Sequence, residues 1–136
     1  MDVTTGRTLV AVHRRDASVL DLPGRRWGLL LGPDNVGARN ATLGFSSFPP
    51  GSAPAGHVHP AEEELIYVVS GRGRLVATDA TVELEPGMAV YVPPGVEHAT
   101  VAGPDEPLEL ITAFSPPVMP GSYERSGGLR AEGTPA

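Results

Sequence analysis

The sequence predicts an all-β fold, either a sandwich or a barrel of short strands. Seventeen glycines and 15 prolines fill 32 of the 136 positions, about twice their average share. Both residues are costly inside helices, so this composition disfavours a helical bundle. Apolar residues instead occur in short stretches that Gly, Pro, Asp or Asn close at regular intervals, as in sandwiches and barrels.

The first third of the chain predicts two short strands separated by turns. Residues 8–13 (TLVAVH) have strand composition, and residues 16–26 form a turn-rich segment that contains a Pro-Gly pair. Residues 27–31 are a short apolar run ended by Gly and Pro, and a polar loop follows over 34–40. No stretch of the chain predicts a confident helix.

The middle of the chain predicts the strongest strand. Residues 41–48 have strand composition and stop at Pro-Pro-Gly. Residues 63–70 (EELIYVVS) are rich in β-branched residues, and Gly71 closes them. Five further strands are expected over 74–78, 81–85, 88–92, 98–101 and 108–114, the first two forming a hairpin around Asp79-Ala80.

The length limits the chain to one domain, because two independent cores do not fit in 136 residues. We expect a single domain over residues 1–115. The remaining residues, 116–136, are rich in Pro, Gly, Ser and charged residues, and we expect them to form a tail.

Missing residue types and the net charge exclude several function classes. Without cysteine the chain has no disulfide, thiolate nucleophile or thiolate metal site, and without lysine it has no Schiff base and no P-loop. A net charge of −6 disfavours nucleic acid as a partner. No apolar run approaches a membrane span, and residues 1–15 lack a signal-peptide pattern, so we expect neither a membrane nor a secreted location but the cytoplasm.

Three of the four histidines fit a metal site. His57 and His59 are two residues apart, so on an extended segment both imidazoles point to the same side. Three glutamates follow, and Glu64 begins the strongest strand, from which it can project inward. His98 starts a later strand. Three imidazoles and a carboxylate suit Fe, Mn, Ni, Cu, Co or Zn as divalent ions, and not calcium.

These residues also stand in an order that resembles the cupins. The stretch from Gly51 to Gly71 (GSAPAGHVHPAEEELIYVVSG) matches the first cupin motif at every fixed position, and residues 87–102 (GMAVYVPPGVEHATVA) match the second, except that Ala102 stands where the motif has Asn. The 15 residues between them, Arg72 to Pro86, are the short spacing of small single-domain cupins of the RmlC-like jelly-roll superfamily.

The resemblance implies a double-stranded β-helix, a jelly-roll barrel of six to eight strands around one divalent metal. The implied ligands are His57, His59, Glu64 and His98. Glu64 is favoured over Glu63 because six residues separate it from Gly71, whereas Glu63 would face the other side of the strand. Four protein ligands leave two positions of a six-coordinate ion for water, substrate or oxygen.

Other polar residues give weaker signals. Tyr67, Tyr91 and Glu63 are the remaining candidates for catalysis, although strand alternation from Glu64 turns Tyr67 away from the metal. Glu62 is expected on a solvated rim or hydrogen-bonded to a ligand histidine. Arg39 is a possible partner for a substrate carboxylate. His13 stands outside the pattern and has no expected role in the site.

The sequence favours an enzyme that acts on a small oxygenated metabolite, most readily an Fe(II)-type dioxygenase. A redox-neutral lyase, isomerase or cyclase is the first alternative, since a metal can also serve as a Lewis acid. A binding or sensing module without turnover is the second, because a fold does not fix a function. We also expect a homodimer, because a small jelly roll has sheet edges that need covering, and the resemblance implies that residues 8–13 can add to a neighbour's sheet.

Overall fold

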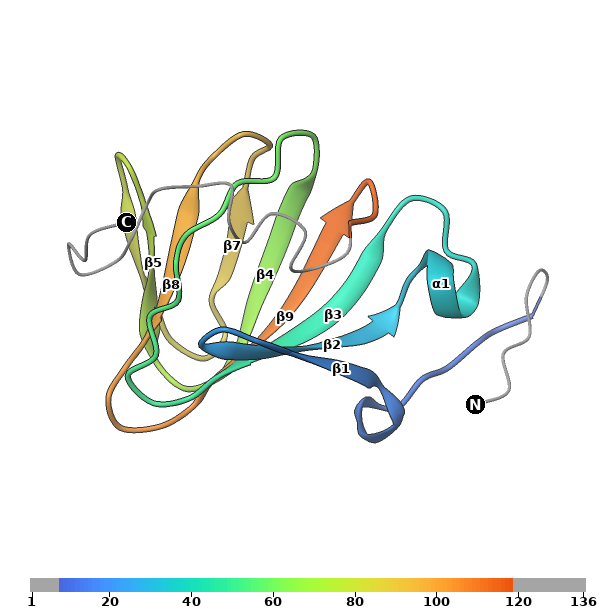
Figure 1. The fold of residues 1–136 in the computed structure, drawn as a ribbon, viewed down its shortest axis with the longest axis horizontal. Helices are drawn as coiled ribbons and strands as arrows, with labels where there is room; N and C mark the ends of the chain where they lie inside the picture. The colour runs from blue at the N-terminus through green and yellow to red at the C-terminus, as the bar shows by residue number, and fades with distance from the viewer. Residues whose placement is uncertain (1–7, 119–136) are drawn as a thin grey trace.

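The computed structural model describes residues 8–118, which form two facing β-sheets (Figure 1). The larger sheet has six strands in the order β1-β2-β3-β9-β4-β7, and the smaller has three in the order β6-β5-β8. The strands are β1 (Ser18–Leu22), β2 (Arg25–Leu31), β3 (Thr42–Phe48), β4 (Glu63–Ser70), β5 (Gly73–Ala77), β6 (Thr81–Leu84), β7 (Ala89–Val92), β8 (His98–Ala102) and β9 (Leu108–Ser115). Every strand pairing within residues 8–118 is antiparallel, which confirms the jelly-roll class.

The inner faces of the two sheets form the core. Every second residue of β9 from Leu108 to Phe114 is buried, and β4 alternates in the same way from Glu64 to Val68, as a sheet with one covered face requires. Val68 and Leu108 are fully buried, a transfer that stabilises the fold by about 1.5–3 kcal/mol per side chain. The main cluster contains Phe48, Ile66, Val68, Leu75, Leu84, Val92, Ala102, Leu108 and Leu110.

Gly71 ends β4 where no other residue fits. Its φ of +85° is left-handed, and an added Cβ would lie 2.1 Å from the carbonyl oxygen of Pro107. The chain can therefore turn from β4 into β5 against the loop before β9 only with glycine here. Gly95, in the turn before β8, has a φ of +81°, which is left-handed as well.

The N-terminal part differs from the expectation. Residues 8–13 form no strand; His13 caps a short 3₁₀ helix, η1 (Arg14–Asp16), by accepting a hydrogen bond from the Arg15 amide. Residues 16–26, expected as turns, contain β1, because only Pro23 and Gly24 are needed for the hairpin to β2. The expected loop over 34–40 begins with a single helical turn, α1 (Pro33–Val36), in which Asn35 bonds the Gly32 amide.

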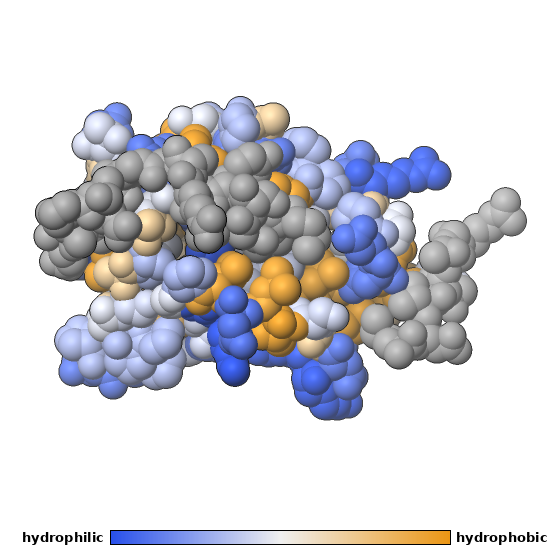
Figure 2. All heavy atoms as spheres, in the orientation of Figure 1, coloured by the Kyte–Doolittle hydropathy of each residue, from blue (hydrophilic) through white to orange (hydrophobic). Residues whose placement is uncertain are grey.

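On the face shown in Figure 2, hydrophilic side chains surround a group of hydrophobic ones in the middle. No helix within residues 8–118 is long and apolar enough to cross a membrane. Most of the expected tail, residues 119–136, lies outside the described residues, as do residues 1–7.

Candidate metal centre

The chain before β4 runs back along β8 and brings the histidines together. The amide of Ala102 donates to the carbonyl of Ser52, and His57 and His98 exchange both of their backbone hydrogen bonds at 2.9 and 3.0 Å. His57 and His98 are thus direct partners across two antiparallel segments. Their side chains leave on the same side, and their ring centroids are 4.6 Å apart.

Two further contacts complete the arrangement. The amide of Gly95 donates to the carbonyl of His59 at 2.8 Å, which ties the second histidine to the turn before β8. Glu64 points inward from β4, where its neighbours across the sheet are Val92 on β7 and Phe114 on β9. Its Oε1 atom lies 3.1 Å from Nε2 of His98 and 3.7 Å from Nε2 of His59.

The donor atoms of these four residues fit one metal ion. One ligand atom from each of His57, His59, Glu64 and His98 lies within 4.8 Å of every other. Two donors on opposite sides of a single transition-metal ion, each at about 2.0–2.2 Å from it, lie at most about 4.4 Å apart, and the longest separation here exceeds that limit by only a few tenths of an ångström. A nitrogen-rich set with one carboxylate suits a divalent transition ion.

His98 is held in the orientation that a ligand needs. Its Nδ1 atom lies 3.0 Å from the carbonyl oxygen of Val96. A carbonyl oxygen only accepts, so Nδ1 donates and Nε2 is left to face Glu64. Burial lowers the pKa of His98, but the hydrogen bond to Glu64, its negative charge and the Val96 carbonyl together raise it above the usual value.

The surroundings of His57 lower its pKa, whereas those of His98 raise the pKa of that residue. Burial above all, and then the nearby His98, Arg25 and His59, lower its pKa to about 2. Its imidazole is therefore neutral at physiological pH, which is the form that binds a metal.

The four donors line a narrow cavity between the sheets. The other lining residues are Arg25, Trp27, Ser46, Phe48, Ile66, Thr100, Leu110, Thr112 and Phe114. The centre of a water-sized molecule has about 30 Å³ in which to move, room for one or two waters. Trp27 is anchored in this wall by its indole N–H, which donates to the Thr112 hydroxyl at 3.4 Å.

The three weaker catalytic candidates lie elsewhere. Tyr67 and Tyr91 are about half exposed on the outer face of the larger sheet, and neither they nor Glu63 line the cavity. The carboxylate of Glu63 accepts a hydrogen bond from the Tyr91 hydroxyl, which raises the pKa of that tyrosine. Glu62, expected on a solvated rim, is 8% exposed instead, and its Oε1 atom has no hydrogen-bond partner in the structure.

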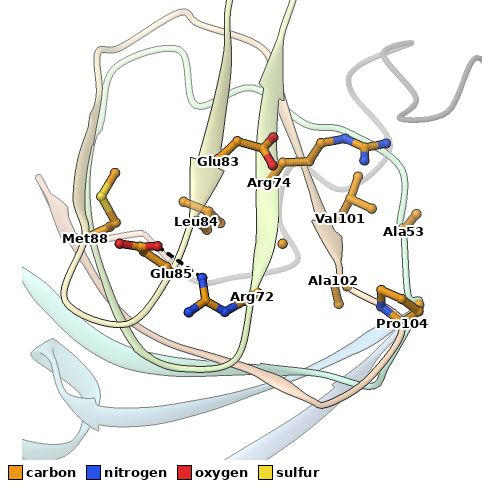
Figure 3. Close-up of a pocket in the computed structure, with 13 residues that line it drawn as sticks. Ala53, Arg72, Arg74, Glu83, Leu84, Glu85, Met88, Val101, Ala102 and Pro104 are labelled. Atoms are coloured by element: carbon orange, nitrogen blue, oxygen red, sulfur yellow. Dashed lines mark hydrogen bonds and ion pairs between the residues drawn. The ribbon is translucent and has the colours of Figure 1, made fainter.

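A roomier hollow lies on the smaller sheet and shares no lining residue with the histidine cavity. Figure 3 shows its charged rim, where Arg72 forms an ion pair with Glu85 at 3.0 Å, and Arg74 lies opposite Glu83 on the next strand. The centre of a water-sized molecule has about 770 Å³ in which to move there, but none of the four donors lines this hollow. The narrow cavity is therefore the candidate site.

Sequence reasoning missed one charged residue of the cavity. Arg39, considered for a substrate carboxylate, is exposed, whereas Arg25 is buried in the cavity wall. Alternation along β2 places Arg25 and Trp27 on the same inner face. The alternation is visible in the sequence, but the prediction of turns over residues 16–26 left Arg25 outside any strand.

Comparisons with known proteins agree with this geometry. The cupin domain family matches residues 44–114. Dimethylsulfoniopropionate lyase DddW of Ruegeria pomeroyi is 32% identical over 80 residues, 59% of this chain and 52% of DddW. Polyketide synthase CurC of Streptomyces cyaneus is 31% identical over 87 residues, 64% of this chain and 56% of CurC. The chain thus spans little more than half the length of these two relatives.

Solved structures give the same fold. The polyketide cyclase RemF from Streptomyces resistomycificus has a TM-score of 0.69 at 28% identity, over 79% of this chain and 80% of RemF. Ectoine synthase from P. lautus has a TM-score of 0.72 at 16% identity, over 82% and 80% of the two chains, and at that identity the likeness concerns the fold alone.

Proposed function

This chain belongs to the cupin family, and on that premise we propose that it is a metal-dependent enzyme acting on a small oxygenated molecule. The observation that carries the proposal is the convergence of His57, His59, Glu64 and His98, whose donor atoms lie within 4.8 Å of one another beside a cavity. Bound there, a divalent transition ion would supply a Lewis acid that polarises a substrate oxygen.

The side chains of the cavity have separate tasks around that ion. The Val96 carbonyl holds a proton on Nδ1 of His98 and keeps Nε2 directed at the site. Buried aromatic side chains, among them Trp27 and Phe114, form part of the cavity wall and keep water away from it. The hydroxyl groups of Ser46, Thr100 and Thr112 offer hydrogen bonds to substrate oxygens.

Few groups in the cavity can transfer a proton. Among the described residues, the ionisable side chains that line the cavity are the four donors and Arg25. Since the tyrosines considered from the sequence point outward, a proton has to pass through one of these groups, through water or within the substrate itself.

Of the two chemistries, the redox-neutral one has the better support. Both the cyclase RemF and the lyase DddW are named for reactions that need no added oxidant, and they are 28% and 32% identical to this chain over the matched regions. We therefore place a lyase, isomerase or cyclase reaction first, ahead of the dioxygenase that the sequence favoured.

The oxygen-dependent reaction is the second candidate. It is favoured by the donor count, because four protein ligands leave two positions of a six-coordinate ion for substrate and dioxygen. As a dioxygenase the protein would need iron or a similar redox-active ion, whereas a Lewis-acid reaction would also proceed with zinc.

One experiment separates these functions. The protein is loaded with Fe(II) or Zn(II) and incubated with small hydroxy acids, keto acids, enediols and phenolic polyketides, with and without oxygen. Product formed equally in both atmospheres and with both metals supports the redox-neutral enzyme, and oxygen uptake with Fe(II) alone supports the dioxygenase. Ligand-dependent thermal stabilisation without any product would contradict both and indicate a binding module.

We further propose that the protein is a cytoplasmic homodimer. Leu65, Tyr67 and Val69 on β4 and Tyr91 on β7 are about half exposed on one face of the larger sheet. Leu65 lies directly opposite Tyr91 in the register. An apolar sheet face of this kind is a common association surface, and we place it beside the segment 8–13 as a second candidate contact.

A further inference from the structure

We propose that Thr112 determines specificity in the cavity by donating a hydrogen bond to a keto or carboxyl oxygen of the substrate, separate from the oxygen that the metal ion takes. This inference rests on the proposed function, because it names a second group that the substrate of the same site carries. Its basis is a buried hydroxyl in the cavity wall that already accepts one hydrogen bond and has a proton left to donate.

The register of the larger sheet places Thr112 beside the candidate ligand Glu64. Glu64 pairs directly with Phe114 on β9, and Thr112 lies two residues before Phe114 on the same inner face. Residues in this diagonal relation lie about 7–8 Å apart across two antiparallel strands. Both side chains line the cavity, so a ligand of a few atoms that is bound to the ion can also reach the hydroxyl.

The apolar core does not require a hydroxyl at this position. Thr112 is 3% exposed, and its direct neighbours across the sheet are Gly44 on β3 and Ile66 on β4. Valine has nearly the same shape and is also favoured in strands. A buried hydroxyl, in contrast, costs free energy unless its hydrogen bonds are made, so this threonine points to a hydrogen-bonding task.

Anchoring the indole of Trp27 accounts for only half of that task. The ring leans over Gly44, where an added Cβ would lie 2.2 Å from it, and its N–H donates to the Thr112 hydroxyl at 3.4 Å. An indole can only donate, whereas a hydroxyl both accepts and donates. Thr112 makes no other side-chain hydrogen bond within residues 8–118, so its own proton is available to a ligand.

The available proton and the size of the cavity define the ligand. A donated hydrogen bond needs an acceptor, which a keto or carboxyl oxygen supplies and an alkyl group does not. Ser46 adds a second hydroxyl, because it is 5% exposed, lines the cavity and pairs directly with Trp27 in the register. The free space of about 30 Å³ for the centre of a water-sized molecule admits only a few atoms. The substrate therefore carries two oxygen functions a few bonds apart, one for the ion and one for Thr112.

The test compares pyruvate with isobutyrate, an anion of the same shape in which a methyl group and a hydrogen replace the keto oxygen. Trp27 is the single tryptophan of the chain, so its ¹⁵N-labelled indole N–H gives one resonance that reports on the Thr112 hydroxyl. Both ligands are titrated into the intact Zn(II)-loaded protein. We expect pyruvate to shift the resonance in a saturable manner and to bind more tightly than isobutyrate. Equal affinities, or no shift with pyruvate, would overturn the proposal.

Three substitutions separate the hydroxyl from the ion. In Thr112→Val the preference for pyruvate should fall about 3–10-fold, the range expected for one hydrogen bond, and Thr112→Ser should retain it. Thr42→Val is the matched control, because Thr42 is 2% exposed on the inner face of β3 but does not line the cavity. An undiminished preference in Thr112→Val would mean that the ion alone holds the keto oxygen, which contradicts the inference. If that variant does not fold, a nuclear Overhauser contact between the Thr112 methyl group and pyruvate in the parent chain decides, and its absence contradicts the inference.

Zn(II) binding is measured by calorimetry on the same samples. A preference for pyruvate that depends on Thr112, in a protein that does not bind Zn(II), would contradict the proposed function while supporting the oxygen-binding role of Thr112. Zn(II) binding at full strength with equal affinities for pyruvate and isobutyrate would contradict only the role of Thr112.

Discussion

A histidine binds a metal through one ring nitrogen, and the hydrogen bond of the other nitrogen decides which one that is. In His98 the Val96 carbonyl engages Nδ1, and Nε2 faces Oε1 of Glu64 at 3.1 Å. In the metal-free protein a proton occupies this contact, and a metal ion would have to displace it. The residue is thus prepared for binding by its own turn, two residues before β8.

Removing a single donor should weaken metal binding strongly. We expect His98→Ala and His57→Ala each to lower the Zn(II) affinity by at least about 10–100-fold, since changes in partners of ligands already have effects of that size. Isothermal calorimetry measures the affinity. His13→Ala is the control, because His13 caps η1 and stands apart from the donors; equal affinity in all three variants would remove these residues from the site.

The lowered pKa of His57 predicts how the metal-free protein responds to acid. In the unfolded chain this histidine titrates near 6.5, whereas in the folded protein its pKa is about 2. Below pH 6.5 the unfolded chain therefore binds a proton that the folded protein does not. We expect the free energy of unfolding to fall by up to about 1.4 kcal/mol per pH unit from pH 6 to pH 5.

His98 has the opposite sign, because its raised pKa contributes stability that is present below pH 6.5 and is lost as the pH rises through its folded value. Urea unfolding with a chelator at pH 5, 6 and 7 measures both effects. In His57→Asn the decrease on the acid side should become shallower, and an unchanged slope would contradict the assignment to His57.

At the scale of single elements, β2 and β3 pack so closely that their glycines are required. A Cβ added to Gly44 would lie 2.2 Å from the ring of Trp27 and 2.7 Å from the carbonyl oxygen of Gly28. Trp27 forms part of the cavity wall, so this contact between strands also shapes the site.

Gly44→Ala should therefore destabilise the protein by about 1–3 kcal/mol, as overpacking does, and displace Trp27. Trp27 is the single tryptophan of the chain, so its fluorescence emission reports the displacement directly. Gly87→Ala is the comparison, because its Cβ would meet nothing within 4 Å and only its φ of +94° is unfavourable. An emission change in Gly87→Ala as large as in Gly44→Ala would contradict this account.

The elements differ in how far the sequence predicts them. β4 agrees with residues 63–70 because its β-branched residues alternate and Gly71 ends it. β1 was missed, since its residues are mostly exposed at the edge of the sheet and carry little core pattern. The contact of residues 51–57 with β8 is a pairing between distant segments, which the composition of neither segment reveals. The spacing nevertheless predicts the cluster, because His57 and His59 are two residues apart on an extended segment, while Glu64 lies near the start of β4 and His98 begins β8.

At the scale of the whole molecule, we expect the core to form without a metal. The main cluster packs between the sheets through apolar side chains such as Ile66, Val68 and Leu110, and an all-β domain of this length buries enough surface to fold. Metal removal should leave a β-rich circular dichroism spectrum with a lower melting temperature, and activity should disappear. A random-coil spectrum would make the metal structural, and undiminished activity would exclude it from the reaction.

The apolar face formed by Leu65, Tyr67, Val69 and Tyr91 predicts association of two copies. Sedimentation at tens of micromolar should give a dimer, and Tyr67→Glu with Tyr91→Glu should give monomers, because both side chains are about half exposed and the changes place charge in the contact. Arg72→Gln, which alters the exposed turn between β4 and β5, should remain dimeric. A parent chain that sediments at 14.1 kDa would contradict the proposal.

The central claim is that three imidazoles and one carboxylate hold a single ion between the sheets. X-ray absorption of the Zn(II)-loaded protein tests it most directly, because it counts the neighbours of the metal. The account predicts one equivalent of zinc, nitrogen and oxygen neighbours at about 2.0–2.2 Å and outer-shell scattering from three imidazoles, falling to two in His98→Ala. Scattering from one imidazole or none, or a spectrum unchanged in His98→Ala, would contradict it.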